Sequence, residues 1–310
     1  MDTMENNRRR MVELLGRLAT LDGMRPSALE SVRLLRTRCS SGRMPVMYGP
    51  CIVIVAQGRK RGYVRDLEFC YDARNYLTLT VPLPFECETE TAEDGPFLGV
   101  AIDIDLAILS DLMMQMGTKS RPTLVASPEA TVTATPLDAA LSDATVRLLE
   151  CMLSPQDAAV LGPQVIREIT YRVFCGRQGG ALHSLLLMDG PRAQMHRILH
   201  RMHSEYAKPL DVSKLAADAG MSVSALHHHF KALTETSPLQ YLKTVRLHKA
   251  RMFMAQDAMA ASVAADRVGY ESPSQFSREF KRLFGASPSE ETQRMRAAFG
   301  VAEDSSLRAG

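Results

Sequence analysis

Two segments of the chain carry polar and basic residues in a pattern suited to contact with nucleic acid. Hydroxyl, amide, imidazole and guanidinium groups hydrogen-bond base edges, whereas ammonium and guanidinium groups also neutralise phosphates. We expect base contacts from Ser224, His227 and His228 in the first segment and from Ser274, Gln275, Ser277 and Arg278 in the second. Phosphate contacts are expected from Lys231, Lys281 and Arg282. Arg278 is the strongest candidate, because a guanidinium can hold guanine through two hydrogen bonds.

The two segments are copies of one another at an offset of 50 residues. SVSALHHHFKALTETSP, from Ser222 to Pro238, aligns with SPSQFSREFKRLFGASP, from Ser272 to Pro288, with seven identical positions. An Ala-rich stretch ending at Gly220 or Gly269 precedes each copy, and glycine permits a sharp turn. Each copy therefore predicts a helix–turn–helix unit, whose polar second helix suits a major groove.

A helix from about Pro238 to Met254 connects the two units. At 1.5 Å per residue it spans about 26 Å. This length sets the two second helices about 34 Å apart, which is one turn of DNA. Four basic residues decorate this helix, where we expect solvent or phosphates to meet them: Lys243, Arg246, Lys249 and Arg251.

The motif GYESPSQFSREFKRLFGASP, ending at Pro288, resembles the AraC/XylS family of bacterial transcription regulators, and the resemblance extends over residues 192–297. The segment YGPCIVIVAQGRKRGYVRDLEFCYDARNYLTLTVPLPFECE, from Tyr48, is similar to the cupin-like N-terminal domain of one AraC subgroup. The resemblance implies a cytoplasmic, sequence-specific DNA-binding regulator that is not an enzyme and needs no cofactor. It also implies an activator that works with RNA polymerase, a homodimer, and control by a small molecule. Some relatives respond to reactive aldehydes, which suggests an electrophile-responsive regulator as an alternative.

Charge is distributed unevenly along the 310 residues. Residues 1–191 carry 20 Lys and Arg against 23 Asp and Glu, whereas residues 192–300 carry 16 against 10. A basic half is consistent with contact to nucleic acid. The longest clean apolar run, Cys51–Ala56, is too short to cross a membrane, and the charged N-terminus lacks the apolar core of a signal peptide.

The first half of the chain changes from helical to strand periodicity. Apolar spacing over residues 7–38 predicts two helices, separated at Gly23 and Pro26. Short β-rich pieces then recur every 8–12 residues, which is typical of an antiparallel sandwich or small barrel. The expected strands are Pro50–Ala56, Gly62–Val64, Leu67–Tyr71, Tyr76–Val81, Phe85–Thr91 and Phe97–Ile104, followed by a helix over residues 103–116.

The sequence thus predicts an α+β multidomain protein: an N-terminal antiparallel β cupin-like domain with flanking helices, and a C-terminal all-α domain with two helix–turn–helix units. The expected parts are residues 1–120 for sensing, 121–191 for a linker and helical pair, 192–300 for DNA binding, and a disordered tail over 301–310. The helical pair, Leu137–Leu153 and Pro155–Phe174, has one apolar side, which either packs against the barrel or forms a homodimer interface.

Rival chemistries lack the necessary residues in the barrel. Cupin metal sites use several histidines, and the first histidine of this chain is His183. A Ser or Cys nucleophile needs an adjacent base, so enzymatic catalysis is not expected. His196, His200 and His203 share a helix face, but no cysteine or acid at suitable spacing completes a metal site.

Three cysteines fall on predicted strands of the sensor domain: Cys51, Cys70 and Cys87. Buried, inert thiols are the ordinary expectation. The alternative is an electrophile sensor, for which the basic stretch Arg59–Arg61 would lower the pKa of Cys51 if it folded nearby. A further alternative is a ligand-binding protein with a degenerate DNA-binding repeat.

Overall fold

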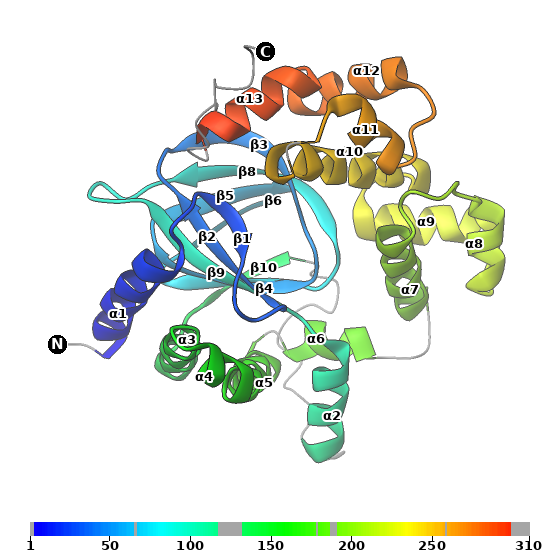
Figure 1. Ribbon diagram of the computed structural model, residues 1–310. Helices are drawn as coiled ribbons and strands as arrows, with labels where there is room; N and C mark the ends of the chain where they lie inside the picture. The colour runs from blue at the N-terminus through cyan, green and yellow to red at the C-terminus, as the bar shows by residue number, and fades with distance from the viewer. Residues whose placement is uncertain are drawn as a thin grey trace, which may run out of the picture.

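The computed structural model describes residues 3–64, 67–116, 132–177, 179–186, 191–257 and 259–298. A curled antiparallel sheet forms the N-terminal part, and helices of the C-terminal part lie along one end of it (Figure 1). The described strands form one sheet in the order β1-β2-β9-β4-β7-β6-β5-β8-β3, with β10 paired to β7. Their bounds are β1 Gly23–Pro26, β2 Val32–Thr37, β3 Ser41–Tyr48, β4 Cys51–Gln57, β5 Arg59–Val64, β6 Leu67–Asp72, β7 Asn75–Leu79, β8 Leu83–Glu90, β9 Phe97–Asp103 and β10 Val132–Pro136.

Strand β4 explains why CIVIVA is a continuous apolar run. Side chains alternate between the two faces of a strand, and both faces of β4 are covered. Cys51, Val53 and Val55 point into the curled sheet, where they join a core with Tyr71 and Phe97. Ile52, Ile54 and Ala56 point outward into a second core beneath the helices. A strand buried on both faces needs apolar residues at every position, so its sequence does not alternate between apolar and polar residues, and CIVIVA does not.

Helices cover the outer face of the sheet. They are α1 Thr3–Leu18, α2 Leu106–Met116, α3 Ala139–Cys151, α4 Pro155–Val160, α5 Gly162–Cys175 and α6 Gly179–Leu186. The apolar side of α3, carried by Leu141, Leu148 and Leu149, is buried against α1, α5 and the sheet of the same chain. Within the chain this face packs toward the barrel through α1 and α5, as in the first of the two alternatives.

Two local predictions for the first half are wrong, and one strand was not predicted. The second N-terminal helix is instead the hairpin β1–β2, because Val32 and Leu34 pair with β9 and bury their side chains there. Strand β3 was not expected; it lies at the sheet edge, where Pro45 costs no interior hydrogen bond. The single helix over Pro155–Phe174 is two helices, since α5 begins anew at Gly162 with a proline in its first turn.

The six predicted strands are confirmed within a few residues as β4 to β9, and the helix over 103–116 is α2, capped by Asp105, whose carboxylate accepts from Ala107 N at 2.7 Å. The first part of the expected linker and helical pair, residues 121–131, lies outside the described residues, after which β10 begins. The tail predicted over residues 301–310 also lies outside them.

All the secondary structure described in the C-terminal part is helical. Its helices are α7 Pro191–Ser204, α8 Val212–Asp218, α9 Val223–Thr234, α10 Pro238–Gln256, α11 Ala261–Arg267, α12 Pro273–Phe284 and α13 Pro288–Ala298. They enclose two separate cores, one around Leu226, Phe230 and Tyr241 and the other around Phe276 and Phe280. The helix α10 runs between the two cores and contributes to both.

Candidate nucleic-acid interface

The two copies of the repeat form two helix–turn–helix units, α8–α9 and α11–α12. The turns need glycine, because Gly220 and Gly269 adopt positive φ angles of 66° and 83°. Ser222 and Ser272 cap the second helices, accepting hydrogen bonds from the backbone N–H groups of Ala225 and Gln275. Ser237 caps α10 in the same way, accepting a hydrogen bond from the backbone N–H of Gln240. At the start of α13 the capping is reciprocal, because Ser287 and Glu290 each accept a hydrogen bond from the other's backbone N–H.

Each second helix buries one face and leaves a polar face exposed. Leu226 and Phe230 on α9, like Phe276 and Phe280 on α12, have at most 1% of their surface exposed. The opposite faces are solvent-exposed at nearly all the predicted positions: Ser224, His227, His228 and Lys231 on α9, and Ser274, Ser277, Arg278, Lys281 and Arg282 on α12. Both copies therefore present donors and positive charge outward from a fixed apolar base.

Gln275 differs from the other predicted base-reading residues. It is half-buried, and its side-chain amide donates to Glu279 Oε1 at 3.1 Å. Glu279 also accepts from Lys243 Nζ and from the Tyr270 hydroxyl, each at 2.7 Å. Burial raises the pKa of Glu279, but Lys243, Tyr270 and Gln275 outweigh it and lower the pKa below its ordinary value. An ionised Glu279 thus gathers residues of α10 and α12 around itself, and Gln275 belongs to this cluster.

The four basic residues of α10 are all engaged within the protein, which corrects the expectation that solvent or phosphates meet them. Arg246 donates to the backbone carbonyls of Tyr206, Lys208 and Gly269 at 2.8–2.9 Å. Burial lowers the pKa of Arg246 from its ordinary value. Lys243 holds Glu279, Lys249 lies over the ring of Tyr206, and Arg251 pairs with Glu291. These residues fix the two units to α10.

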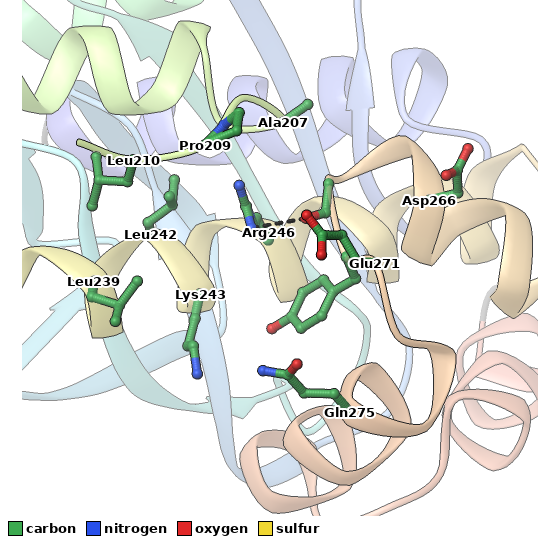
Figure 2. Close-up of a pocket in the computed structure, with 12 residues that line it drawn as sticks. Ala207, Pro209, Leu210, Leu239, Leu242, Lys243, Arg246, Asp266, Glu271 and Gln275 are labelled. Atoms are coloured by element: carbon green, nitrogen blue, oxygen red, sulfur yellow. Dashed lines mark hydrogen bonds between the residues drawn. The ribbon is translucent and has the colours of Figure 1, made fainter.

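A groove of about 430 Å³ separates the two units, and Arg246 lies at its centre (Figure 2). On one side is the loop through Ala207 and Pro209, before α8; on the other is the turn between α11 and α12, with Glu271. Because Arg246 bonds carbonyls of both sides, one side chain spans the groove. The spacing of the two second helices is therefore held by hydrogen bonds as well as by apolar packing.

The three candidate thiols lie in different surroundings in the barrel. Cys51 is buried, and burial raises its pKa to about 12. Arg59 and Arg61 lie beside half-buried Cys70 and not beside Cys51, so the expected effect of this basic stretch on Cys51 is wrong. Burial also raises the pKa values of Cys70 and Cys87. Cys87 alone of the three lines a described cavity, which has a volume of about 590 Å³.

That cavity lies between the barrel and the helical part and was not predicted from the sequence. Lys60 of β5 faces into it, beside Tyr48 of β3 and Phe97 of β9. Arg251 of α10 and Phe284 of α12 close it from the helical side. The alternation of Arg59, Lys60 and Arg61 carried the signal: on a strand, the middle residue points to the opposite face from its neighbours.

The histidine face of α7 does not gather metal ligands in the described structure. His203 Nε2 lies 2.8 Å from the hydroxyl of Tyr241, and burial lowers the pKa of His203 to about 4. Over the described ranges, no group of three His, Cys, Asp or Glu side chains is placed to hold a metal ion. None of the helices described is long and apolar enough to span a bilayer.

Two family models match the chain. The AraC-type transcriptional regulator N-terminus matches residues 28–181, and a helix-turn-helix domain matches residues 215–294. The curated relatives match over short stretches, about as long as the second of these regions. GlxA, an HTH-type transcriptional regulator of Rhizobium meliloti, is 33% identical over 91 residues, which are 29% of this chain and 28% of GlxA. RclR, described as an RCS-specific transcriptional activator of Escherichia coli, is 35% identical over 85 residues, 27% of this chain and 30% of RclR.

The chain therefore spans less than a third of the length of these curated relatives. Similarity to solved structures extends further. ToxT of Vibrio cholerae with a bound unsaturated fatty acid covers 88% of this chain and 97% of its own, with a TM-score of 0.62 and 13% identity. A second ToxT structure, with (E)-4-(8-methylnaphthalen-1-yl)but-3-enoic acid, covers 86% and 99% with the same TM-score and 12% identity. The predicted fold class is thereby confirmed: a curled antiparallel sheet domain followed by a helical domain with two helix–turn–helix units.

With an AraC-type N-terminal domain matched to the barrel and its helices, and a helix-turn-helix domain matched to the paired units on α10, this chain belongs to the AraC family of transcriptional regulators, which are not enzymes.

Proposed function

We propose that this protein is a sequence-specific DNA-binding transcription regulator that acts in the bacterial cytoplasm. The observation that carries the proposal is the pair of exposed, polar helices α9 and α12, which share one sequence pattern and are fixed to one rigid connector, α10. The length of α10 is expected to set these helices about one DNA turn apart, and they would then read successive major grooves on one face of the duplex.

The proposed contacts follow from exposure and chemistry. Ser224, His227 and His228 read bases from α9, and Ser274, Ser277 and Arg278 read bases from α12. Lys231, Lys281 and Arg282 bind phosphates. Gln275 was expected to read a base. In this proposal it instead helps to position Glu279, because its amide already donates to that carboxylate.

The N-terminal domain supplies control by a small molecule. Two relatives in fold, both ToxT structures, hold a fatty acid or a naphthyl-butenoic acid, and we infer that a fold of this kind accommodates a small organic effector. The electrophile-responsive alternative has less support. Burial raises the pKa of Cys51, Cys70 and Cys87, which lowers the fraction of reactive thiolate.

We further propose that the regulator is a homodimer and activates transcription through RNA polymerase. The buried side of α3 is not its interface. The outer surface of α4 and α5 is a better candidate, because Val160, Leu161 and Tyr171 expose 44–63% of their surface there. Light scattering on wild type and Val160→Lys checks this: the wild type should have twice the mass of the variant. Equal monomeric masses would contradict dimerisation.

Salt-dependent DNA binding tests the function itself. We expect footprinting on the DNA beside the regulator's own coding region to protect two successive turns on one face. The logarithm of the binding constant should fall linearly with the logarithm of salt, with a slope of about −3 per bound protomer for the three proposed phosphate contacts. Replacing Lys231, Lys281 and Arg282 by Met should reduce the slope by about 3. A salt-independent, unspecific interaction would instead indicate a degenerate repeat in a ligand-binding protein.

A further inference from the structure

The turn that follows β7 leaves the barrel and enters the helical part. Its Val81 is only 1% exposed and belongs to the apolar core of the first helix–turn–helix unit, together with Leu226 and Phe230 of α9. Met47 of β3 packs against the same core. Protein cores are close-packed, so each residue that fills one supports the elements around it. The barrel thus supplies part of the core on which α9 rests.

Tyr241 of α10 joins this turn to α9. Its buried hydroxyl donates to the backbone carbonyl of Pro82 at 2.8 Å. Its ring meets the ring of Phe230 edge to face, with 5.4 Å between the ring centres and 85° between the planes. Aromatic pairs in this arrangement are favourable beyond the area that they bury. One side chain therefore contacts both the barrel and the inner face of the first recognition helix.

The hydroxyl of Tyr241 has two hydrogen-bond partners when the turn is in place. Its single hydrogen goes to Pro82, so it accepts from His203 Nε2 on α7, 2.8 Å away. Burial lowers the pKa of His203 to about 4, which keeps this imidazole neutral at ordinary pH. If the turn moved away, the buried hydroxyl would lose its acceptor, and such a loss is costly. Polar and apolar contacts therefore favour the same docked arrangement.

The second unit meets the barrel in another way. The 50-residue offset of the repeat places Glu291 of α13 where the first unit has Tyr241. Glu291 pairs with Arg251, which donates to the backbone carbonyl of Pro45 on β3. Among the described residues, the core of this unit comes from residues 206–284, all of them in the helical part. The barrel thus touches the second unit at its surface but enters the core of the first.

We propose that the barrel controls DNA binding through the first helix–turn–helix unit, with the turn over residues 80–82 positioning α9 through Val81 and Tyr241. The inference rests on the proposed function and gives its regulation a route. Docking leaves Ser224 and His227 exposed, so it supports contact of α9 with DNA and does not block it. A change in the barrel that moves this turn weakens the contacts of α9 and spares those of α12.

Hydrogen exchange in the full-length protein tests this route without DNA. Val81→Ala should raise the exchange rates over residues 223–234 at least about fivefold and leave those of residues 273–284 and of β4 as in wild type. Val268→Ala is the matched control, because Val268 is equally buried in the core of the second unit. It should raise exchange over residues 273–284 and leave residues 223–234 unchanged.

Tyr241→Phe provides a second variant that keeps the apolar core. It removes only the hydroxyl that bonds Pro82, and it should raise exchange over residues 223–234 several-fold. This variant decides the outcome if Val81→Ala does not fold. Wild-type exchange over residues 223–234, or an equal rise in α9, α12 and β4, overturns the proposal, because Val81 and Tyr241 would then stabilise the whole protein or nothing.

Footprinting separates this inference from the proposed function. Arg278→Ala, on α12, identifies the half of the binding site that the second unit reads. Val81→Ala should weaken protection of the other half several-fold and leave this half protected. Equal weakening of both halves, with exchange over residues 223–234 as in wild type, refutes the inference alone. A wild-type protein that protects no specific site refutes the proposed function alone, since the exchange result does not depend on DNA.

Discussion

Lys243 on α10 and Glu279 on α12 form an ion pair, with 2.7 Å between Nζ and Oε1. The pair ties the connecting helix to the second recognition helix, and its members expose only 26% and 12% of their side chains. The equivalent position in the first unit is His229, so the two units are held to α10 by different means. The orientation of α12 therefore depends on a polar cluster around one carboxylate.

Replacing this carboxylate should weaken both stability and DNA binding. In Glu279→Ala, Lys243 and the Tyr270 hydroxyl lose their acceptor, and the free energy of unfolding should fall by about 2 kcal/mol. Glu205→Ala, which breaks exposed pairs with Arg201 and Lys208, should cost less than about 1 kcal/mol and serves as control. Urea unfolding measures both. Equal losses in the two variants would show that the cluster around Glu279 contributes no more than a surface ion pair.

The C-caps of the recognition helices give a second prediction. Glu235 ends α9 at φ 69°, ψ 0°, and Gly285 ends α12 at φ 73°, ψ −2°. This left-handed conformation costs a non-glycine residue about 1 kcal/mol. Glu235→Gly should therefore stabilise the protein by about 0.5–1 kcal/mol, and Gly285→Ala should destabilise it by about 1 kcal/mol, as thermal or urea unfolding can measure. A loss in Glu235→Gly would mean that the glutamate side chain contributes more than the strain costs.

The turn glycines should respond unequally to the same substitution. Both Gly220 and Gly269 have positive φ, so alanine costs each about 1 kcal/mol of conformational strain. A Cβ on Gly269 would also lie 2.3 Å from the carbonyl oxygen of Ala207, whereas nothing lies within 4 Å of one on Gly220. We expect Gly269→Ala to cost about 3 kcal/mol or more and Gly220→Ala about 1 kcal/mol. Similar unfolding free energies for the two variants would contradict the close approach at Ala207.

Repetition made the DNA-binding half predictable from sequence, whereas single features of the N-terminal half were ambiguous. The 50-residue offset identified two units, and capping serines and turn glycines confirmed their boundaries. Over residues 29–35, however, apolar spacing suits a helix and a strand equally, and pairing of β2 with β9 decided the outcome. No local pattern reports such a long-range pairing.

The partners of the basic residues on α10 also could not be predicted from the sequence. Arg246 was expected at solvent or phosphate, but its three acceptors are backbone carbonyls 23–40 residues away. Backbone carbonyls are present at every residue, so sequence cannot single them out. The cavity at Lys60 could not be predicted from the sequence either, because its far wall comes from Phe284 and Met295, more than 200 residues later in the chain. Packing of the two domains creates the site.

The buried histidines His203 and His248 should make the folded protein less stable in acid. Burial lowers the pKa of His203 to about 4 and that of His248 to about 3, whereas the unfolded chain titrates near 6.5. Below pH 6.5 the unfolded state therefore binds more protons, and each histidine removes up to about 1.4 kcal/mol per pH unit as pH falls toward its folded pKa. Above pH 6.5 neither histidine makes the free energy of unfolding depend on pH.

His248→Leu should remove one of these two contributions. The slope of unfolding free energy between pH 6 and 4.5 should flatten by about 1.4 kcal/mol per pH unit, measured by urea unfolding at several pH values. His227, which is exposed on α9, provides a matched control, and His227→Leu should leave the slope as in wild type. A wild-type slope in His248→Leu would show that His248 accepts its proton without unfolding.

Arg278 and Arg282 separate the two kinds of DNA contact on one helix. Both are exposed on α12, but only Arg278 is assigned to a base. Arg278→Ala should lose about 1–3 kcal/mol of specific binding with little change for random DNA, because a lost guanine contact removes discrimination. Arg282→Ala should weaken binding to both sequences alike and reduce the salt slope by about 1. Gln275→Ala should alter base preference least, since its amide serves Glu279. If Arg278→Ala retained the wild-type ratio of specific to random affinity, the base contact would have to be reassigned to Ser274 or Ser277, the neighbouring exposed donors on α12.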